Sequence, residues 1–121
     1  MRGRKERFTK QERIQGKKNL LKLALWLSKN KVRGWNMMSC AGCAMAQIPK
    51  AFPKQENAPS GYGYYDSYGG RPGAYTFFAF TPNEEDKMFT SDPLFANDNT
   101  QKEQVAMMRK FARLNPGYKV S

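Results

Sequence analysis

The pattern of hydrophobic and polar residues predicts a first helix from Thr9 to about Lys29. Residues 9–12 form a capping box, in which the Thr9 hydroxyl accepts from a free backbone amide and the Glu12 carboxylate reaches back to the Thr9 amide. The first half of this segment is polar, and Gly16 weakens it by about 1 kcal/mol relative to Ala. Residues 20–27 are apolar on nearly every side. We therefore expect this half to be buried against other elements or another subunit.

A second helix is predicted from Trp35 to Gln47. Its centre is rich in small residues, and the Gly42-x-x-x-Ala46 spacing suits a close contact with another helix. Three prolines follow, at positions 49, 53 and 59. Each lacks an amide donor and restricts the residue before it, so residues 49–74 are predicted to form an extended arm with Gly and Tyr at its centre.

The last third of the chain contains one predicted strand and two predicted helices. The aromatic run Tyr75 to Phe80 is the one β segment that the sequence favours. Residues 81–84 form a second capping box, with a short helix that ends near Phe89. A third box at residues 100–103 begins a helix that ends at Leu114, before Asn-Pro-Gly. Its apolar positions form two adjoining stripes: Val105, Met108 and Ala112, and then Met107, Phe111 and Leu114.

These elements predict a mainly α protein with a large irregular fraction: two N-terminal helices, an extended Pro/Gly/Tyr arm, one short strand and a C-terminal helix. The segments are 1–33, the basic arm and first helix; 34–48, the small-residue helix; 49–80, the extended arm with the strand; and 81–121, the C-terminal helical part. Hydrophobic residues are 40% of the 121 and the mean hydropathy is −0.79. We therefore do not expect an independent globular fold, and the isolated chain should lack a cooperative melt.

Positive charge is concentrated at the N-terminus. The chain has 21 Lys and Arg against 10 Asp and Glu, and twelve of these cations lie in residues 1–33 against Glu6 and Glu12. Such segregation indicates an acidic partner. The candidate contacts are Arg2, Arg4, Lys5, Arg7, Lys10, Arg13, Lys17 and Lys18. RNA is favoured because phosphate contacts release counterions and Arg binds phosphate in a bidentate manner, while acidic protein and lipid headgroups stay open as alternatives.

Apolar and aromatic residues are candidates for docking to partner subunits. They are Leu20, Leu23, Trp26, Leu27, Trp35, Tyr62, Tyr64, Tyr65 and Tyr68. Tyrosines separated by glycine stack on unpaired bases in some single-strand binders, and they also make adhesive contacts with proteins. Because Arg71 is the one cation between residues 55 and 86, the protein contact is favoured.

Cys40-Ala41-Gly42-Cys43 is the one motif with reactive potential. The chain has two Cys and no His, so it supplies at most half of a tetrahedral zinc site or of an iron–sulfur cluster site, and a partner would have to supply the rest. A disulfide or redox pair is the other functional alternative, and simple packing of small residues is favoured over both. Without His there is no imidazole base and no Ser–His or Cys–His pair. We expect neither an enzyme nor a cofactor.

The sequence thus favours a non-catalytic accessory subunit of a large intracellular assembly, anchored to RNA as in a ribosome. A peripheral subunit of a membrane energy-transducing complex, and a protein wedged in a cytoskeletal or virion lattice, are the alternatives. The longest stretch without charge, Gly34 to Pro49, reaches about 24 Å as a helix and is short of the ~30 Å hydrocarbon core. Mitochondrion, plastid and cytoplasm all stay open as the compartment.

Overall fold

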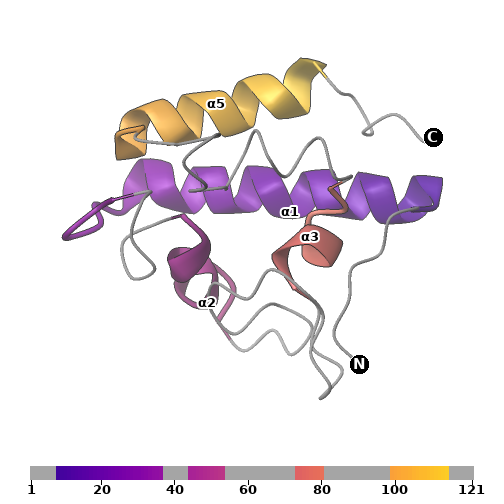
Figure 1. Ribbon diagram of the computed structural model, residues 1–121, viewed down its shortest axis with the longest axis horizontal. Helices are drawn as coiled ribbons and strands as arrows, with labels where there is room; N and C mark the ends of the chain where they lie inside the picture. The colour runs from indigo at the N-terminus through magenta and orange to yellow at the C-terminus, as the bar shows by residue number, and fades with distance from the viewer. Residues whose placement is uncertain (1–7, 37–43, 54–72, 81–98, 115–121) are drawn as a thin grey trace, which may run out of the picture.

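The computed structural model describes residues 8–36, 44–53, 73–80 and 99–114 of the chain. Its elements are α1 (Lys10–Lys29), η1 (Met45–Gln47), α2 (Ile48–Ala51), α3 (Ala74–Phe77) and α5 (Gln101–Leu114). α5 lies along α1 and runs in the opposite direction, whereas α2 and α3 lie on the other side of α1 (Figure 1). Over these four ranges most residues are helical and no strand occurs, which confirms the mainly α class.

α1 begins where its capping box predicts. The Thr9 backbone N–H donates to Glu12 Oε1 at 2.9 Å, and the Glu12 N–H donates to Thr9 Oγ1 at 3.1 Å. The helix continues to Lys29, as expected from the sequence. Gly16 is buried within it and faces the backbone of Phe78. A Cβ atom at Gly16 would lie 2.3 Å from the Phe78 carbonyl oxygen, so glycine is what allows this close approach.

α5 also begins at its capping box. The Thr100 N–H donates to Glu103 Oε1 at 2.9 Å, and the Glu103 N–H donates to the Thr100 hydroxyl at 3.2 Å. Val105, Met108 and Ala112 are buried, so the first predicted stripe is the inner face of the helix. The half-buried side chains of Met107 and Phe111 pack beside it. The C-terminal helix thus ends at Leu114, as the sequence predicts, with its first stripe in the core.

The second helix differs from its prediction. Trp35 and Asn36 are not helical, residues 44–47 form a turn and the 3₁₀ helix η1, and α2 begins only at Ile48. Pro49 lies in the first turn of α2, where a missing amide breaks no helical hydrogen bond. The prediction that regular structure ends at this proline is wrong for that reason. Residues 37–43 lie outside the described residues.

The predicted strand over residues 75–80 is wrong, because the backbone forms α3 and a following turn there. The Phe77 N–H donates to the Gly73 carbonyl at 3.0 Å, and the Ala79 N–H donates to the Thr76 carbonyl at 3.1 Å. Ala79 has a positive φ of 54°. A short apolar run has the same composition in a buried strand and in a buried helical turn, so its pattern alone did not distinguish them. The helix predicted from residue 82 and the centre of the Tyr–Gly arm lie outside the described residues.

A chain of phenylalanine rings joins these segments into one core. Ring centroids are 4.9 Å apart for Phe52 and Phe77, 5.1 Å for Phe77 and Phe78, and 5.6 Å for Phe78 and Phe80. Phe80 then meets Phe111 of α5 edge to face at 5.6 Å. Offset and edge-to-face arrangements of this kind add about 0.5–1.5 kcal/mol per pair beyond the buried area. Leu20, Leu23, Ala24 and Leu27 of α1 complete the cluster.

Candidate nucleic-acid interface

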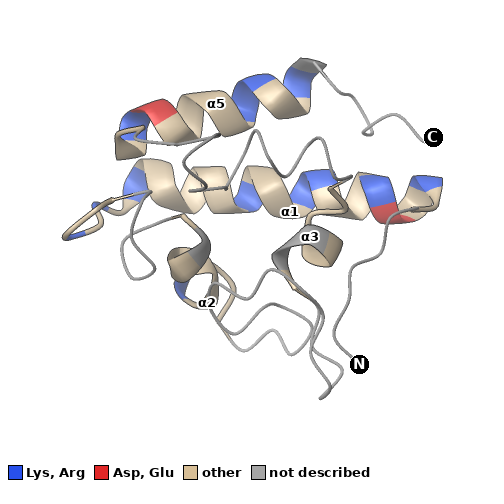
Figure 2. Ribbon diagram, in the orientation of Figure 1, with Lys and Arg blue, Asp and Glu red and all other residues tan. Residues whose placement is uncertain are grey.

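Among the described residues, positive charge far exceeds negative charge. The part of the chain that the structure describes carries thirteen Lys and Arg but only Glu12 and Glu103 as acids. Both carboxylates accept from the backbone N–H of a capping threonine, at 2.9 Å each. Figure 2 shows the cations along α1 and α5, with the acids confined to the first turn of each helix.

The outer face of α1 carries much of this charge. Lys10, Lys18 and Lys29 are exposed and Lys17 is half-buried. At 100° per residue Lys18 and Lys29 fall on the side of the helix opposite its buried residues, and Lys10 and Lys17 lie at the edge of that side. Leu21 and Leu25 lie on the same face, with exposed fractions of 38% and 48%. The face is therefore basic with an apolar centre.

One flank of α5 is also basic. Lys102, Arg109 and Arg113 are exposed, and their spacings of seven and four residues place them on one side of the helix. Ala106 is exposed between them. We define the basic surface as Lys10, Lys17, Lys18, Lys29, Lys31, Lys102, Arg109 and Arg113.

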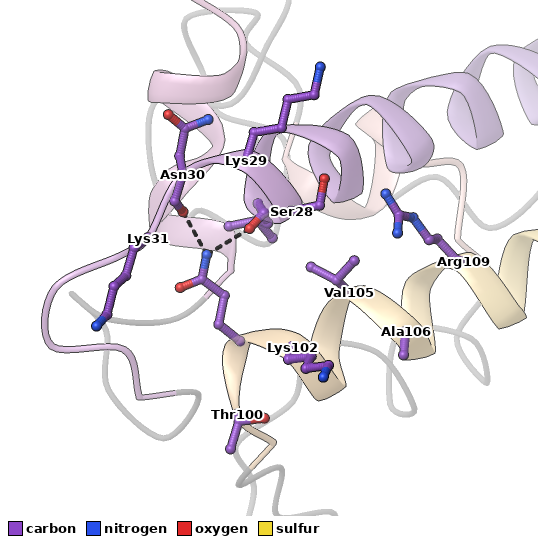
Figure 3. A pocket seen from close by; sticks show the side chains of 11 residues that line it. Ser28, Lys29, Asn30, Lys31, Thr100, Lys102, Val105, Ala106 and Arg109 are labelled. Atoms are coloured by element: carbon purple, nitrogen blue, oxygen red, sulfur yellow. Dashed lines mark hydrogen bonds between the residues drawn. The ribbon is translucent and has the colours of Figure 1, made fainter.

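An open groove, with a volume of about 780 Å³, lies between the end of α1 and the start of α5. The groove is lined by Leu27, Ser28, Lys29, Asn30, Lys31, Thr100, Gln101, Lys102, Val105, Ala106 and Arg109. Four of these residues are cations, and none of the described lining residues is an acid. Figure 3 shows the Arg109 side chain extending from α5 toward Ser28, with Val105 between the two helices. Lys29 and Lys31 extend outward at the margin of the groove.

The Gln101 side chain holds the two walls of the groove together. Its Nε2 donates to the Leu27 carbonyl at 2.8 Å and to the Asn30 carbonyl at 2.7 Å. Its Oε1 accepts from the Val32 N–H at 2.9 Å. We call these three bonds the Gln101 bridge. A fourth bond, from the Trp35 indole N–H to the Asn99 carbonyl at 2.9 Å, supports the same junction.

Arg13 does not belong to the basic surface, which corrects the sequence-based assignment. Its side chain is only 3% exposed, and its guanidinium donates to the Ala79 carbonyl. The cause is geometric: Arg13 lies on the side of α1 that faces residues 77–80, whose carbonyls need donors. Lys10 and Lys18 are exposed and Lys17 is half-buried, so these three side chains stay candidate contacts. Arg2, Arg4, Lys5 and Arg7 lie outside the described residues.

The residues predicted to dock partners also need correction. Leu20, Leu23 and Leu27 are buried in the core of this chain itself, so they are not free to contact another subunit. Trp26 and Trp35 are half-buried and pack against the same core. The tyrosines at 62, 64, 65 and 68 lie outside the described residues.

Sequence reasoning missed both the exposed leucines of α1 and the groove. Leu21 and Leu25 were not distinguished from their neighbours, because residues 20–27 are apolar on every side. The spacing of Lys102, Arg109 and Arg113 is visible in the sequence, but cations in the last turns of a helix also suit its dipole, so the spacing alone does not indicate a binding surface. The pairing of α1 with α5 is what brings them together with Lys29 and Lys31.

The described residues contain no candidate metal site. Among the four described ranges, no cluster of three or more His, Cys, Asp or Glu side chains could hold a metal ion. Cys40 and Cys43 lie outside those ranges. No helix within them is long and apolar enough to span a bilayer.

The comparisons with known proteins give no relative. The chain matches no protein-family model, and it has no significant similarity to a curated protein or to a solved structure.

Proposed function

We propose that the protein is a non-catalytic accessory subunit of a large assembly, and that its basic surface binds the phosphate backbone of RNA. The observation that carries this proposal is the thirteen cations against two carboxylates among the described residues, with every cation but Arg13 exposed or half-buried and both carboxylates bound in helix caps. Phosphate contacts would then meet little local repulsion. Each such contact releases counterions, so binding should weaken steeply with salt.

The distribution of the cations along the two helices favours an extended, chain-like polyanion as the partner. The cations lie along the length of two antiparallel helices rather than at one point, and the N-terminal arm adds Arg2, Arg4, Lys5 and Arg7 to the same chain. A phosphodiester backbone presents one negative charge per nucleotide and suits such a track.

A specific observation supports a second candidate, a peripheral subunit of a membrane complex. Leu21 and Leu25 are exposed among lysines on the outer face of α1. A helix with apolar residues between flanking cations is typical of proteins that lie on an anionic bilayer. RNA ranks first because the α5 flank carries Lys102, Arg109 and Arg113, and the exposed large hydrophobic side chains of the described residues, Leu21 and Leu25, both lie on α1 instead.

The first test is recovery of the tagged protein from gently lysed cells, with and without ribonuclease. Under the proposal, its partners include ribonucleoprotein components and ribonuclease releases them. Partners that are unaffected by ribonuclease and lost on carbonate extraction would favour the membrane complex instead.

A direct test uses the full chain and a twelve-nucleotide oligouridylate, with the dissociation constant measured at several salt concentrations. The triple variant Lys10→Gln, Lys17→Gln, Lys18→Gln should lower the slope of log affinity against log salt by about 2, since single strands contribute about 0.7 per phosphate contact. The control Lys50→Gln with Lys110→Gln removes two exposed cations outside the basic surface, and it is compared with the triple variant as the change in slope per charge removed. A triple variant with the wild-type slope would contradict the proposal.

A further inference from the structure

We propose that the groove between α1 and α5 is a nucleoside-phosphate site, which holds one nucleotide unit of the RNA strand. This inference rests on the proposed function and assigns a particular place to one phosphate. Four cations from three segments line the groove: Lys29 from α1, Lys31 from the chain that follows it, and Lys102 and Arg109 from α5. No acid occurs among the described lining residues.

The groove contains both arginine and lysine, and the two side chains can bind a phosphate group in different ways. The planar Arg109 guanidinium can donate two parallel hydrogen bonds to two phosphate oxygens. Lysine carries a point charge on a flexible stem, so Lys29 and Lys31 can turn inward from the margin where Figure 3 shows them. The site therefore combines one directional donor with mobile charge around it.

The floor of the groove is apolar and suits the rest of a nucleotide. Ala106 is the exposed aliphatic residue of this lining, whereas Leu27 and Val105 also line the groove but are only 3% and 6% exposed. A volume of about 780 Å³ lies within the range of about 300–1,000 Å³ that is usual for small-molecule sites. A ribose or the face of a base can pack on such a floor, whereas inorganic phosphate alone would leave it uncovered.

The Gln101 bridge reduces one obstacle to an anion at this position. The last carbonyls of α1 carry partial negative charge, which would repel a phosphate. Gln101 Nε2 donates to two of these carbonyls, those of Leu27 and Asn30, at 2.8 and 2.7 Å. The first turn of α5, with its positive dipole end, is fixed beside them by the same side chain.

The test uses the full chain with methyl-labelled Leu, Val and Ala, and three probes: twelve-nucleotide oligouridylate, uridine monophosphate and inorganic phosphate. The oligonucleotide and uridine monophosphate should both shift the Leu27, Val105 and Ala106 methyl resonances. Inorganic phosphate should bind at least tenfold more weakly than uridine monophosphate, because it does not cover the apolar floor.

Two variants then locate the site. Lys102→Gln with Arg109→Gln removes two groove cations, and Ala106→Glu places an acid in the groove at an exposed helical position that does not disturb the core. Each should reduce oligonucleotide affinity at least tenfold more than the control Lys50→Gln with Lys110→Gln, which removes the same charge as the first variant.

The outcomes separate this inference from the proposed function. If the wild-type protein binds no oligonucleotide, the proposed function fails and this inference fails with it. If it binds oligonucleotide but the groove variants match the control, only the groove assignment is overturned. Methyl shifts with uridine monophosphate but none with the oligonucleotide would assign the groove to a free nucleotide and overturn its role in RNA binding.

Discussion

The two ends of α1 hold their neighbours by opposite means. In its first half, α1 supplies the polar groups: Arg13 donates to the Ala79 carbonyl, and the Asn19 side-chain amide donates to the Phe77 carbonyl at 2.9 Å. At its last turn, α1 supplies carbonyls and the Gln101 side chain of α5 donates to them. Both junctions satisfy backbone groups with side chains from a distant part of the chain.

The difference explains why the first half of α1 is polar in sequence. The carbonyls of Phe77 and Ala79 lie at a turn, and they accept from the side chains of Asn19 and Arg13 on the neighbouring helix α1. A buried carbonyl without a donor costs about 1–3 kcal/mol. At the other end, α5 is regular and packs on α1 by apolar contact, so a single glutamine is enough to join them.

The largest loss of stability is expected from a substitution at Gly16. In Gly16→Ala the new Cβ would lie 2.3 Å from the Phe78 carbonyl oxygen and 2.7 Å from the Ala79 Cβ, so the two segments must separate. Such overpacking costs typically 1–3 kcal/mol or more, which exceeds the gain of about 1 kcal/mol in helix propensity. We expect a net loss of about 2 kcal/mol, measured as a fall of about 30-fold in hydrogen-exchange protection of the Ala79 amide.

Gly34→Ala is the control for that variant. Gly34 has a φ of +68° and nothing within 4 Å of an added Cβ, so its cost is conformational and local. The Ala79 amide should keep its protection in this variant. Equal loss in both variants would mean that the contact at Gly16 is not what holds the two segments.

Arg13 should give the next largest effect, and it separates structural from binding cations. Arg13→Met removes the donor to the Ala79 carbonyl, and a hydrogen bond from a charged group is worth about 1.5–3 kcal/mol. We expect a loss of Ala79 amide protection of at least about tenfold, with the salt dependence of oligonucleotide binding unchanged. Lys10→Met, at an exposed position one turn earlier, should give the reverse pattern. If Arg13→Met lowered the slope of log affinity against log salt concentration, Arg13 would have to be counted among the cations that bind the oligonucleotide.

Features of this fold that depend on neighbouring residues were predictable from the sequence, whereas contacts between distant segments were not. The capping boxes at Thr9 and Thr100 and the apolar stripe through Met108 are local patterns, so the extent of α1 and α5 was predictable. Arg13 and Asn19 look like surface residues because their acceptors lie more than fifty residues away. The groove was unpredictable for the same reason, since Lys29 and Arg109 meet only through the packing of two helices.

The Gln101 bridge should give a smaller and more local effect. Gln101→Ala removes three partly exposed hydrogen bonds and gains helix propensity, so we expect a net loss of about 1 kcal/mol at the junction. The Val32 amide, which donates to Gln101 Oε1, should lose most of its hydrogen-exchange protection. Lys102→Ala changes the next exposed residue and should leave that amide protected. Protection of Val32 in Gln101→Ala would mean that the bridge does not hold the junction.

The smallest effect is a pH dependence at the start of α5. The pKa of Glu103 is lowered from 4.5, chiefly because the Thr100 backbone amide donates to the carboxylate and secondly because of the Thr100 hydroxyl. A carboxylate with a lowered folded pKa stabilises the fold above its unfolded pKa, and this contribution is lost as the pH falls below about 4.5 and through the folded pKa. Protection of the Gln104 amide, which donates to the Thr100 carbonyl at 2.8 Å, should therefore decrease between pH 5 and pH 3. Glu103→Gln keeps the shape and cannot ionise, so its protection should be flat over this range. An equal decrease in both proteins would show that the α5 cap is not the group that titrates.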